Sequence, residues 1–448
     1  MEDTGERIRI RFVTKYEDYR VADAAVAVPS KLGRYGLSEV VNHLLDNPTP
    51  VPFDFIINNT LVRTSLRKFV QQNRISTEEV LVVDYIPVTS FSGEAKSSEC
   101  PAWVGALQLA SPVSVFAGCY NGQLRVLCSS TLEEKVSVQA HELPIRSLAC
   151  WSDSSARVLA ATASKDMSVR CWEVSQPKKG GCSLSCLGRF ESAISSVECV
   201  ERWTDSGTDM LVAGDWGGHI FGYRLSGLDR PSQTEDQDTT GKRKKKKINA
   251  SESTPTSVDA GVDGATVIPH DFSLHAHTQA VSHLQSCPST GRLYTSSWDH
   301  SVKEWDLEKQ ECVATLAGSK VVTSMNFCRE NNLIATSHPD GRVRLWDSRS
   351  RDSSVCVNSF VNGDDMHWVS QVKWSPVNSN SFCTSDYDGA VRLWDTRAAL
   401  PLTSTAAHDG KALCIEWNNV VKSSDGSSLE VFSGGSDCSV KSTPLLSG

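Results

Sequence analysis

The segment Asp388-Gly389-Ala390-Val391-Arg392-Leu393-Trp394-Asp395 holds the pattern that decides the fold of this 448-residue chain. An Asp suited to a tight turn is followed six positions later by a Trp, with alternating apolar residues between them. The same spacing occurs at Asp166 to Trp172, Asp299 to Trp305 and Asp340 to Trp346. Weaker copies run from Asn121 to Leu127, Gly217 to Tyr223 and Asp437 to Thr443. The chain therefore contains an internal repeat of short strands and turns.

This repeat resembles the WD repeat, which has four short strands per unit and a period of about 40–45 residues. Residues 103–446 are predicted to form an all-β propeller of seven blades, because ring closure removes sheet edges that would otherwise aggregate. One interval is too long, since Tyr223 and Trp305 stand 82 residues apart. Residues 229–269 fill that interval and are rich in Ser, Thr, Asp and Gly with almost no aromatic residue. We predict a disordered basic insertion there, between blades three and four.

In three copies of the repeat a His precedes the turn Asp by 22 to 29 residues. In a WD blade such a His can bond the Asp of the turn between the second and third strands. We expect buried networks of Trp, Ser or Thr, His and Asp, each hydrogen bond contributing about 1 kcal/mol. A catalytic His–Asp pair is the alternative, but a motif repeated in several blades favours a structural role. The predicted network residues are His141, Asp166, Trp172, His277, Asp299, Trp305, Asp340, Trp346, Asp388, Trp394, His408 and Asp437.

A basic run, Lys242-Arg243-Lys244-Lys245-Lys246-Lys247, lies inside the long insertion. We interpret it as a nuclear import signal, because it stands out in an acidic chain and lies on an accessible loop. A solvated block of charge is the alternative, and contact with RNA phosphates is compatible with either interpretation. The whole chain has 45 Lys and Arg against 53 Asp and Glu, for a net charge of −8. This balance argues against a protein covered in positive charge for nucleic acid.

Several functional classes are disfavoured by what the sequence lacks. No run approaches 18 apolar residues, and the N-terminus is polar and acidic, so neither a transmembrane helix nor a secretory signal is expected. The 15 Cys contain no CxxC pair, which favours reduced thiols in an intracellular protein over a zinc site or a disulfide scaffold. No nucleotide-binding, zincin or hydrolase motif occurs. We therefore expect no enzyme, no cofactor and no metal held by this chain alone.

The first 99 residues differ in composition from the rest, because all 12 Trp lie at or after Trp103 and all 15 Cys at or after Cys100. Strands are predicted at 7–13, 19–28, 53–57, 61–63 and 80–85, and an amphipathic helix at 36–45. Two strands, a helix and three strands follow the β-grasp order of ubiquitin. Residues 7–88 are therefore predicted to form an α+β ubiquitin-like (β-grasp) domain, joined to the propeller by a linker at 89–102.

This combination of domains resembles the eukaryotic ribosome-biogenesis WD-repeat proteins of the Pescadillo complex, whose close relative Notchless shares the N-terminal domain type. The most telling stretch is Arg74-Ile75-Ser76-Thr77-Glu78-Glu79-Val80-Leu81-Val82-Val83-Asp84-Tyr85, which looks like the end of the Notchless-type domain. Tyr85-Ile86-Pro87 matches the Tyr-x-Pro that follows in Notchless. Residues 88–98 are small and polar instead of basic and aromatic, and this departure, with the basic insertion, favours the Pescadillo-complex family.

The resemblance implies a non-enzymatic assembly factor for the large ribosomal subunit precursor, working in the nucleolus and nucleoplasm. Its propeller would bind the block-of-proliferation protein, which holds Pescadillo, and its ubiquitin-like domain would bind the AAA ATPase midasin. In the family a Glu of this domain completes the coordination of a metal held by midasin. Glu78 matches that position, with Glu79 as the fallback, and an octahedral cation such as Mg²⁺ accepts a carboxylate oxygen from a partner. The alternative is that Ser76 and Glu79 form a helix capping box.

A second function from another class is a substrate receptor of a cullin-based ubiquitin ligase. Such receptors carry Trp-Asp-x-Arg, which occurs here at Trp346-Asp347-Ser348-Arg349 and Trp394-Asp395-Thr396-Arg397. An Arg in this place can also follow a strand simply to meet solvent. An RNA-binding propeller is a third interpretation, supported only by the basic run. Neither alternative uses the N-terminal domain.

Overall fold

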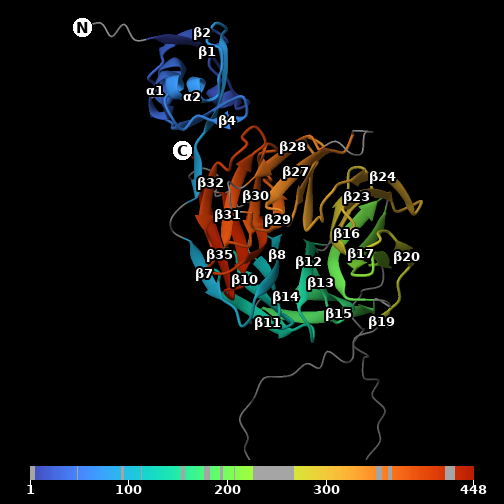
Figure 1. Cartoon of the computed structure of the whole chain (residues 1–448). Helices are drawn as coiled ribbons and strands as arrows, with labels where there is room; N and C mark the ends of the chain where they lie inside the picture. Colours follow the sequence, from blue (N-terminus) through green and yellow to red (C-terminus); the bar gives the residue numbers. More distant parts are fainter. Residues whose placement is uncertain are drawn as a thin grey trace, which may run out of the picture.

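The computed structural model describes residues 6–47, 49–91, 95–111, 114–152, 157–175, 182–191, 195–205, 207–225, 267–349, 356–361, 366–418 and 429–447. A small α+β domain lies beside a large ring of sheets (Figure 1). Neither of the two described α-helices is long and apolar enough to cross a membrane.

The N-terminal domain is one mixed sheet with two helices packed on it. Its sheet order is β2-β1-β5-β3-β4, with β1 and β5 parallel and the other neighbours antiparallel. Alternation along β1 sends Ile8, Ile10 and Phe12 into the core. The elements are β1 (Arg7–Val13), the short 3₁₀ helix η1 (Glu17–Tyr19), β2 (Ala25–Pro29), α1 (Arg34–Leu45), β3 (Phe53–Ile57), β4 (Thr60–Leu61), α2 (Leu66–Gln72) and β5 (Leu81–Pro87).

Two local predictions for this domain were wrong. The strand expected at 19–28 begins only at Ala25, because the preceding backbone bonds a side chain instead of a neighbouring strand: the Tyr85 hydroxyl donates to the Tyr19 carbonyl and accepts from the Val21 N–H. The helix α2 was not predicted, since seven residues give only two turns of periodicity. Its buried side chains, Leu66, Phe69 and Val70, nevertheless have helical spacing.

Seven sheets follow in the described part of the chain, and their strands pair antiparallel except for the two-residue strand Val267–Ile268, which pairs parallel at the edge of the second sheet. We number them sheets 1 to 7 in chain order. Sheet 1 is β8 (Val104–Ser111), β9 (Ser114–Cys119), β10 (Gln123–Cys128) and β11 (Glu134–Gln139). Sheet 2 is β12 (Ile145–Ser152), β13 (Val158–Ser164), β14 (Ser168–Ser175) and β15 (Ser183–Glu191), and sheet 3 is β16 (Val197–Asp205), β17 (Thr208–Asp215), β18 (His219–Arg224) and β20 (Phe272–His275).

Sheets 4 to 7 repeat this arrangement. Sheet 4 is β21 (Val281–Cys287), β22 (Arg292–Ser297), β23 (Ser301–Asp306) and β24 (Glu311–Ala317), and sheet 5 is β25 (Ser324–Cys328), β26 (Leu333–Ser337), β27 (Arg342–Asp347) and β28 (Asn358–Val361). Sheet 6 is β29 (Val369–Trp374), β30 (Ser381–Asp386), β31 (Ala390–Asp395) and β32 (Thr403–Ala406). Sheet 7 contains β33 (Ala412–Asn418), β34 (Leu429–Gly435) and β35 (Ser439–Ser447).

The first strand of every sheet lies innermost, and these strands contact one another in succession around the ring. β8 contacts β12, and the series continues through β16, β21, β25 and β29 to β33, which contacts β8 again. Figure 1 looks along the axis of this ring, with the inner strands around its centre. Apolar side chains fill the seams between sheets, as where Cys414 and Phe432 of sheet 7 pack with Val104 and Leu107 of sheet 1.

The outer strand of sheet 7 comes from the other end of the chain. β6 (Thr89–Phe91) and β7 (Lys96–Glu99) both pair antiparallel with β35, with Phe91 opposite Leu445 and Glu99 opposite Ser439. The prediction that residues 89–102 form a linker was therefore wrong. The residues of β7 are small and polar because β7 is an outermost strand, mostly exposed, whose outer edge meets solvent.

The long insertion also lies elsewhere than predicted. It connects β18 to β20, which are the third and fourth strands of sheet 3, so it does not separate two sheets. The sequence repeat ends at the third strand of each sheet, and the fourth strand belongs to the next repeat, which explains the displacement by one strand. At the end of the insertion β19 (Val267–Ile268) pairs parallel with β15 of sheet 2. The basic run at 242–247 lies outside the described residues.

Ring closure by β6 and β7 can be tested with two truncated chains. A chain starting at Val88 keeps both strands, whereas a chain starting at Pro101 leaves the edge of β35 unpaired. We expect the shorter chain to melt roughly 3–6 °C lower and to aggregate more readily, because an exposed strand edge is a template for pairing. Equal melting temperatures in circular dichroism would contradict this role of residues 89–99.

Candidate functional site

Glu78 lies in the exposed segment between α2 and β5. The chain leaves α2 through Arg74, which has a left-handed backbone with φ of 52°. The Glu78 N–H donates to the Ser76 hydroxyl at 3.3 Å, and Arg9 of β1 donates to the Glu78 carbonyl oxygen at 3.4 Å. These contacts hold the backbone of Glu78, while its residue surface stays exposed.

The alternative interpretation of this segment, a capping box, is wrong. No helix begins at Ser76, and the chain bends directly into β5. The Ser76 hydroxyl bonds the amide two residues ahead, which is a local Ser turn, instead of the amide three residues ahead as a cap would. Glu79 is exposed beside Glu78. In the described residues no group of three or more His, Cys, Asp or Glu could hold a metal ion, so a cation at Glu78 would need ligands from elsewhere.

Sheets 2 and 4 each contain a buried hydrogen-bonded chain of four side chains. In sheet 2, His141 Nδ1 lies 2.9 Å from Asp166 Oδ2 and its Nε2 lies 2.6 Å from Thr162 Oγ1. Trp172 Nε1 donates to the same Thr162 oxygen at 3.0 Å. In sheet 4 the equivalent chain is His277, Asp299, Thr295 and Trp305, with distances of 3.0, 2.7 and 3.0 Å.

The charges in the network of sheet 2 are set by burial and hydrogen bonding. Burial lowers the pKa of His141, although Asp166 opposes the shift, so the imidazole is neutral. Burial tends to raise the pKa of Asp166, but hydrogen bonds from His141 and Ser168 hold that pKa well below its usual range. The network of sheet 2 therefore ties a loop to the middle of its sheet through a neutral imidazole.

The remaining predicted network residues follow other patterns. In sheet 7, His408 Nδ1 lies 2.9 Å from Asp437 and its Nε2 lies 2.8 Å from Ser433 Oγ, while Thr443 stands where other sheets have Trp. In sheets 5 and 6 the turn carboxylates bond an Arg four residues ahead, Arg344 for Asp340 and Arg392 for Asp388. Their Trp side chains still bond a Thr on the second strand: Trp346 donates to Thr336 at 2.8 Å and Trp394 donates to Thr384 at 3.0 Å.

Sequence reasoning missed these arginines and His338. The Thr336 hydroxyl, which accepts from Trp346, is also hydrogen-bonded to His338, whose Nε2 lies 2.8 Å away. The Nδ1 of His338 lies 2.8 Å from the Val321 carbonyl oxygen. A signal was present: both turns read Asp-Gly-x-Val-Arg, and no His precedes either Asp at the usual distance. In these two sheets the guanidinium of an Arg four residues further along the chain satisfies the turn carboxylate that an imidazole satisfies elsewhere.

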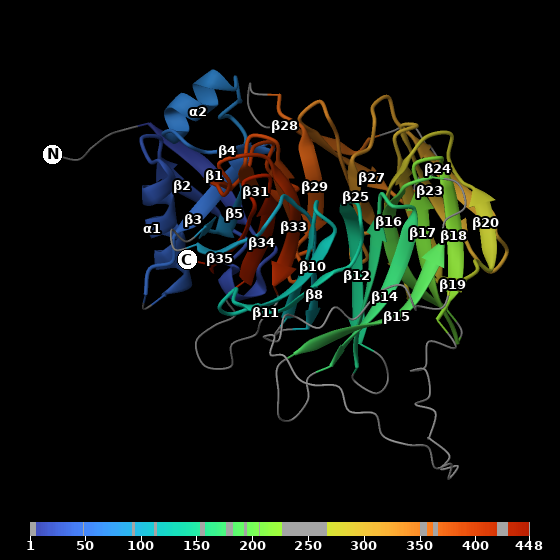
Figure 2. The same ribbon diagram turned by 90° about the horizontal axis from the view of Figure 1, so that it is seen from below.

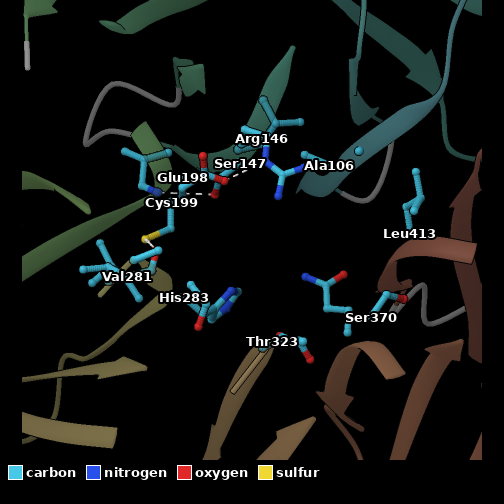
Figure 3. Close-up of a pocket in the computed structure, with 18 of the residues that line it drawn as sticks. Ala106, Arg146, Ser147, Glu198, Cys199, Val281, His283, Thr323, Ser370 and Leu413 are labelled. Atoms are coloured by element: carbon cyan, nitrogen blue, oxygen red, sulfur yellow. Dashed lines mark hydrogen bonds and ion pairs between the residues drawn. The ribbon is translucent and has the colours of Figure 1, made fainter. Parts of the chain in front are cut away.

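The first strands of all seven sheets line a channel of about 180 Å³ at the centre of the ring. Figure 3 shows Arg146, Glu198 and His283 among the side chains around it, with Arg146 Nε 2.8 Å from Glu198 Oε2. Lys373 and Glu416 form a second buried ion pair at 3.1 Å. Burial raises the pKa of Glu201 to about 7 and lowers that of His283 to about 3. Because both signs of charge occur, the channel favours neither an anion nor a cation.

One end of this channel carries an aromatic rim that was not predicted. The starts of first strands and the ends of second strands meet at the same end of an antiparallel sheet, and six aromatic residues occupy such positions. They form three contacting pairs with ring centroids 5.1–5.6 Å apart. The aromatic rim consists of Trp103, Tyr120, Trp216, Trp298, Trp368 and Tyr387.

The rim is accessible and partly cationic. Trp103, Trp216 and Trp368 are 46%, 47% and 41% exposed, which is unusual for Trp and typical of binding surfaces. Arg146 lies over the Tyr120 ring at 5.8 Å and Lys411 over the Tyr387 ring at 4.4 Å. A signal for the rim was present in the sequence, because its four Trp do not stand at the Trp position of the repeat, six residues after the turn Asp.

Comparisons with known proteins cover both parts of the chain. The NLE (NUC135) domain model matches residues 8–70, and the model of the WD domain, G-beta repeat, matches residues 132–173, 270–306, 310–347 and 354–395. The chain is 31% identical to the ribosome biogenesis protein WDR12 homolog of Oryza sativa subsp. japonica, over 96% of this chain and 98% of that protein. It is 30% identical to the proteins of the same name from Chlamydomonas reinhardtii and Arabidopsis thaliana, over 97% of this chain and 97% and 98% of those proteins.

Burial of His338 predicts a pH-dependent stability. Burial lowers the pKa of His338 to about 4, against about 6.5 for an unfolded His. The folded state keeps the neutral ring, so its contribution is fully present above pH 6.5 and is lost as pH falls towards 4. The substitution His338→Gln should therefore cost stability at pH 7, and that cost should shrink by roughly 3 kcal/mol at pH 4. Urea unfolding of both proteins across this range measures the difference, and a cost independent of pH would contradict it.

Proposed function

This chain belongs to the family of ribosome biogenesis proteins of the WDR12 type, and within ribosome assembly we propose that it is a non-catalytic factor for the large ribosomal subunit precursor. The observation that carries the proposal is that the likeness spans 96% of the chain, so it includes both the N-terminal domain and the ring. We propose a ubiquitin-like domain joined to a seven-bladed WD propeller, each with its own partner.

The proposed partner of the N-terminal domain is midasin, with Glu78 as the ligand that its metal ion lacks. Support comes from chemistry and position. The Glu78 carboxylate is exposed on a backbone held by Ser76 and Arg9. A hard divalent cation prefers such an oxygen, and a fixed backbone lowers the entropic cost of binding. Glu79 remains the fallback.

The proposed partner of the ring is the block-of-proliferation protein, and through it Pescadillo. The aromatic rim supports this role, because Trp, Tyr and Arg are enriched in the energetic centres of protein interfaces, and the rim combines exposed Trp with Tyr rings that lie under Arg146 and Lys411. The buried networks are proposed to be structural and not catalytic. The basic run at Lys242–Lys247 remains a proposed nuclear import signal, consistent with work in the nucleolus and nucleoplasm.

The cullin-receptor alternative is weakened by the surroundings of its motif. Arg397 has a side chain only 12% exposed, and the N-terminal domain covers it. Arg349, in the other copy, is 66% exposed and stays accessible. A receptor that needs both copies could not use them in this arrangement.

The role of Glu78 can be tested by pull-down with midasin. We expect Glu78→Ala and Glu78→Asp to abolish binding, because the first removes the metal ligand and the second shortens its reach. Both variants should keep the melting temperature of the native chain, since Glu78 is exposed. Glu79→Ala is the matched control and should bind normally. Normal binding by both Glu78 variants would refute the assignment.

The role of the aromatic rim can be tested by binding to the block-of-proliferation protein. Trp216→Ser with Trp298→Ser removes one contacting pair, and loss of central aromatic anchors should weaken binding by roughly 30-fold or more. Val313→Ser is a control, because Val313 is 51% exposed on the outer strand β24. Unchanged affinity in the double variant, measured by calorimetry, would exclude this face.

A further inference from the structure

The N-terminal domain lies against one end of sheet 6, where the chain connects β29 to β30 and β31 to β32 (Figures 1 and 2). The contact has an apolar centre, in which Ile56, Leu61 and Ile86 pack with Ala398 and Leu402. Ile56 and Ile86 come from β3 and β5 and point away from the core of their own domain. Their burial, to 2% exposed each, therefore depends on the ring.

Four hydrogen bonds surround this apolar centre. Asn378 donates to the Tyr16 hydroxyl at 2.7 Å, and Lys15 donates to the Asn380 side chain at 3.1 Å. Across the same contact the Ala399 N–H donates to the Asn59 carbonyl oxygen at 2.9 Å. Arg63 donates to the Leu402 carbonyl oxygen at 3.3 Å. Backbone groups of both parts are thus satisfied by each other, which a chance contact of two surfaces seldom achieves.

The two Trp-Asp-x-Arg copies provide an internal comparison at this place. In sheet 5 the Arg349 Nε lies 2.9 Å from Asp347, and in sheet 6 the Arg397 Nε lies 2.8 Å from Asp395, so the local geometry is the same. Their exposures differ, at 66% and 12%. The difference arises because Arg397 faces the N-terminal domain, where Tyr16 and Asp84 lie near enough to interact with the guanidinium charge.

The groups around Arg397 come from both parts of the chain. Burial raises the pKa of Tyr16, as does the charge of Asp395, while Arg397 and a hydrogen bond from Asn378 oppose the shift. Burial raises the pKa of Asp84, and Arg397 opposes it. The guanidinium therefore faces carboxylates from the ring and from the domain, together with one phenol.

We propose that the surface around Arg397 at the end of sheet 6, which includes Asn378, Asn380, Ala398 and Ala399, is a docking site. Its ligand is the chain's own N-terminal domain, bound through the outer face of β3 and β5. The connection favours this, because only Val88 separates β5 from β6, and so short a tether keeps the two surfaces at high effective concentration. A partner that reads the motif at Arg397 must first displace the domain. Glu78 remains exposed in the docked state. The proposal does not depend on the partners proposed above.

Hydrogen–deuterium exchange of the full chain tests the docking, with the Ala399 amide as reporter. Ile86→Asp introduces a charge at the apolar centre and should raise the exchange rate of the segment 398–402 at least tenfold, with a larger radius of gyration in solution scattering. Val82→Asp is the matched control, since Val82 is 41% exposed on the same face of the same strand. It should leave both quantities unchanged.

A second pair of variants approaches the site from the ring. Arg397→Ala should accelerate exchange at 398–402, whereas Arg349→Ala should not, although both remove the same contact with an Asp two residues earlier. Arg397→Ala leaves the buried carboxylate of Asp395 without its partner and can destabilise sheet 6, so its melting temperature is measured as well. If Arg397→Ala unfolds, Ile86→Asp decides the outcome. Native exchange in Ile86→Asp, or equal acceleration in Val82→Asp, would overturn the proposal.

Discussion

Closure of the ring is the constraint on which the rest of this structure depends. Each sheet buries its faces against two neighbours, so the faces of sheets 1 and 7 are buried only if these two sheets meet. The contact of β33 with β8 brings Cys414 within 3.5 Å of the Val104 carbonyl oxygen, and the pairing of β6 and β7 with β35 completes the last sheet. The central channel and the aromatic rim exist only in the closed ring, because each draws residues from several sheets.

The closing strands also determine where the N-terminal domain lies. Because β5 runs almost directly into β6, the domain cannot be far from sheet 7, and the neighbouring sheet 6 is the surface within its reach. The ring therefore holds the domain twice, through a continuous chain and through the contact around Ile86 and Arg397. The sequence predicted a domain attached only through a linker, whereas in the structure the domain also packs against the ring.

Much of this architecture could be predicted from the sequence, because its strongest signals are local. The Asp-to-Trp spacing is set by one turn and one strand, and the His–Asp bonds of sheets 2, 4 and 7 link residues that the repeat places in register. The rest could not be predicted because it depends on pairing between distant residues. The strands at 89–99 have no apolar alternation, and the burial of Ile56 and Ile86 by another part of the chain leaves no local trace. The arginines of sheets 5 and 6 show that one requirement, a satisfied turn carboxylate, has two chemical solutions.

The pairing of Phe91 with Leu445 has a consequence for how the protein folds during its synthesis. During synthesis, residues 89–99 are made before the seven sheets, and their partner β35 is made after them. Nearly the whole ring must therefore be synthesised before β6 and β7 can pair with β35. Contacts this distant in sequence form slowly, since the loop between them must close first. During that interval one apolar face of sheet 1 has no neighbouring sheet, and exposed apolar surface favours association with other chains. The unclosed ring, which persists until β35 has been synthesised, is therefore the form of the protein most exposed to such association.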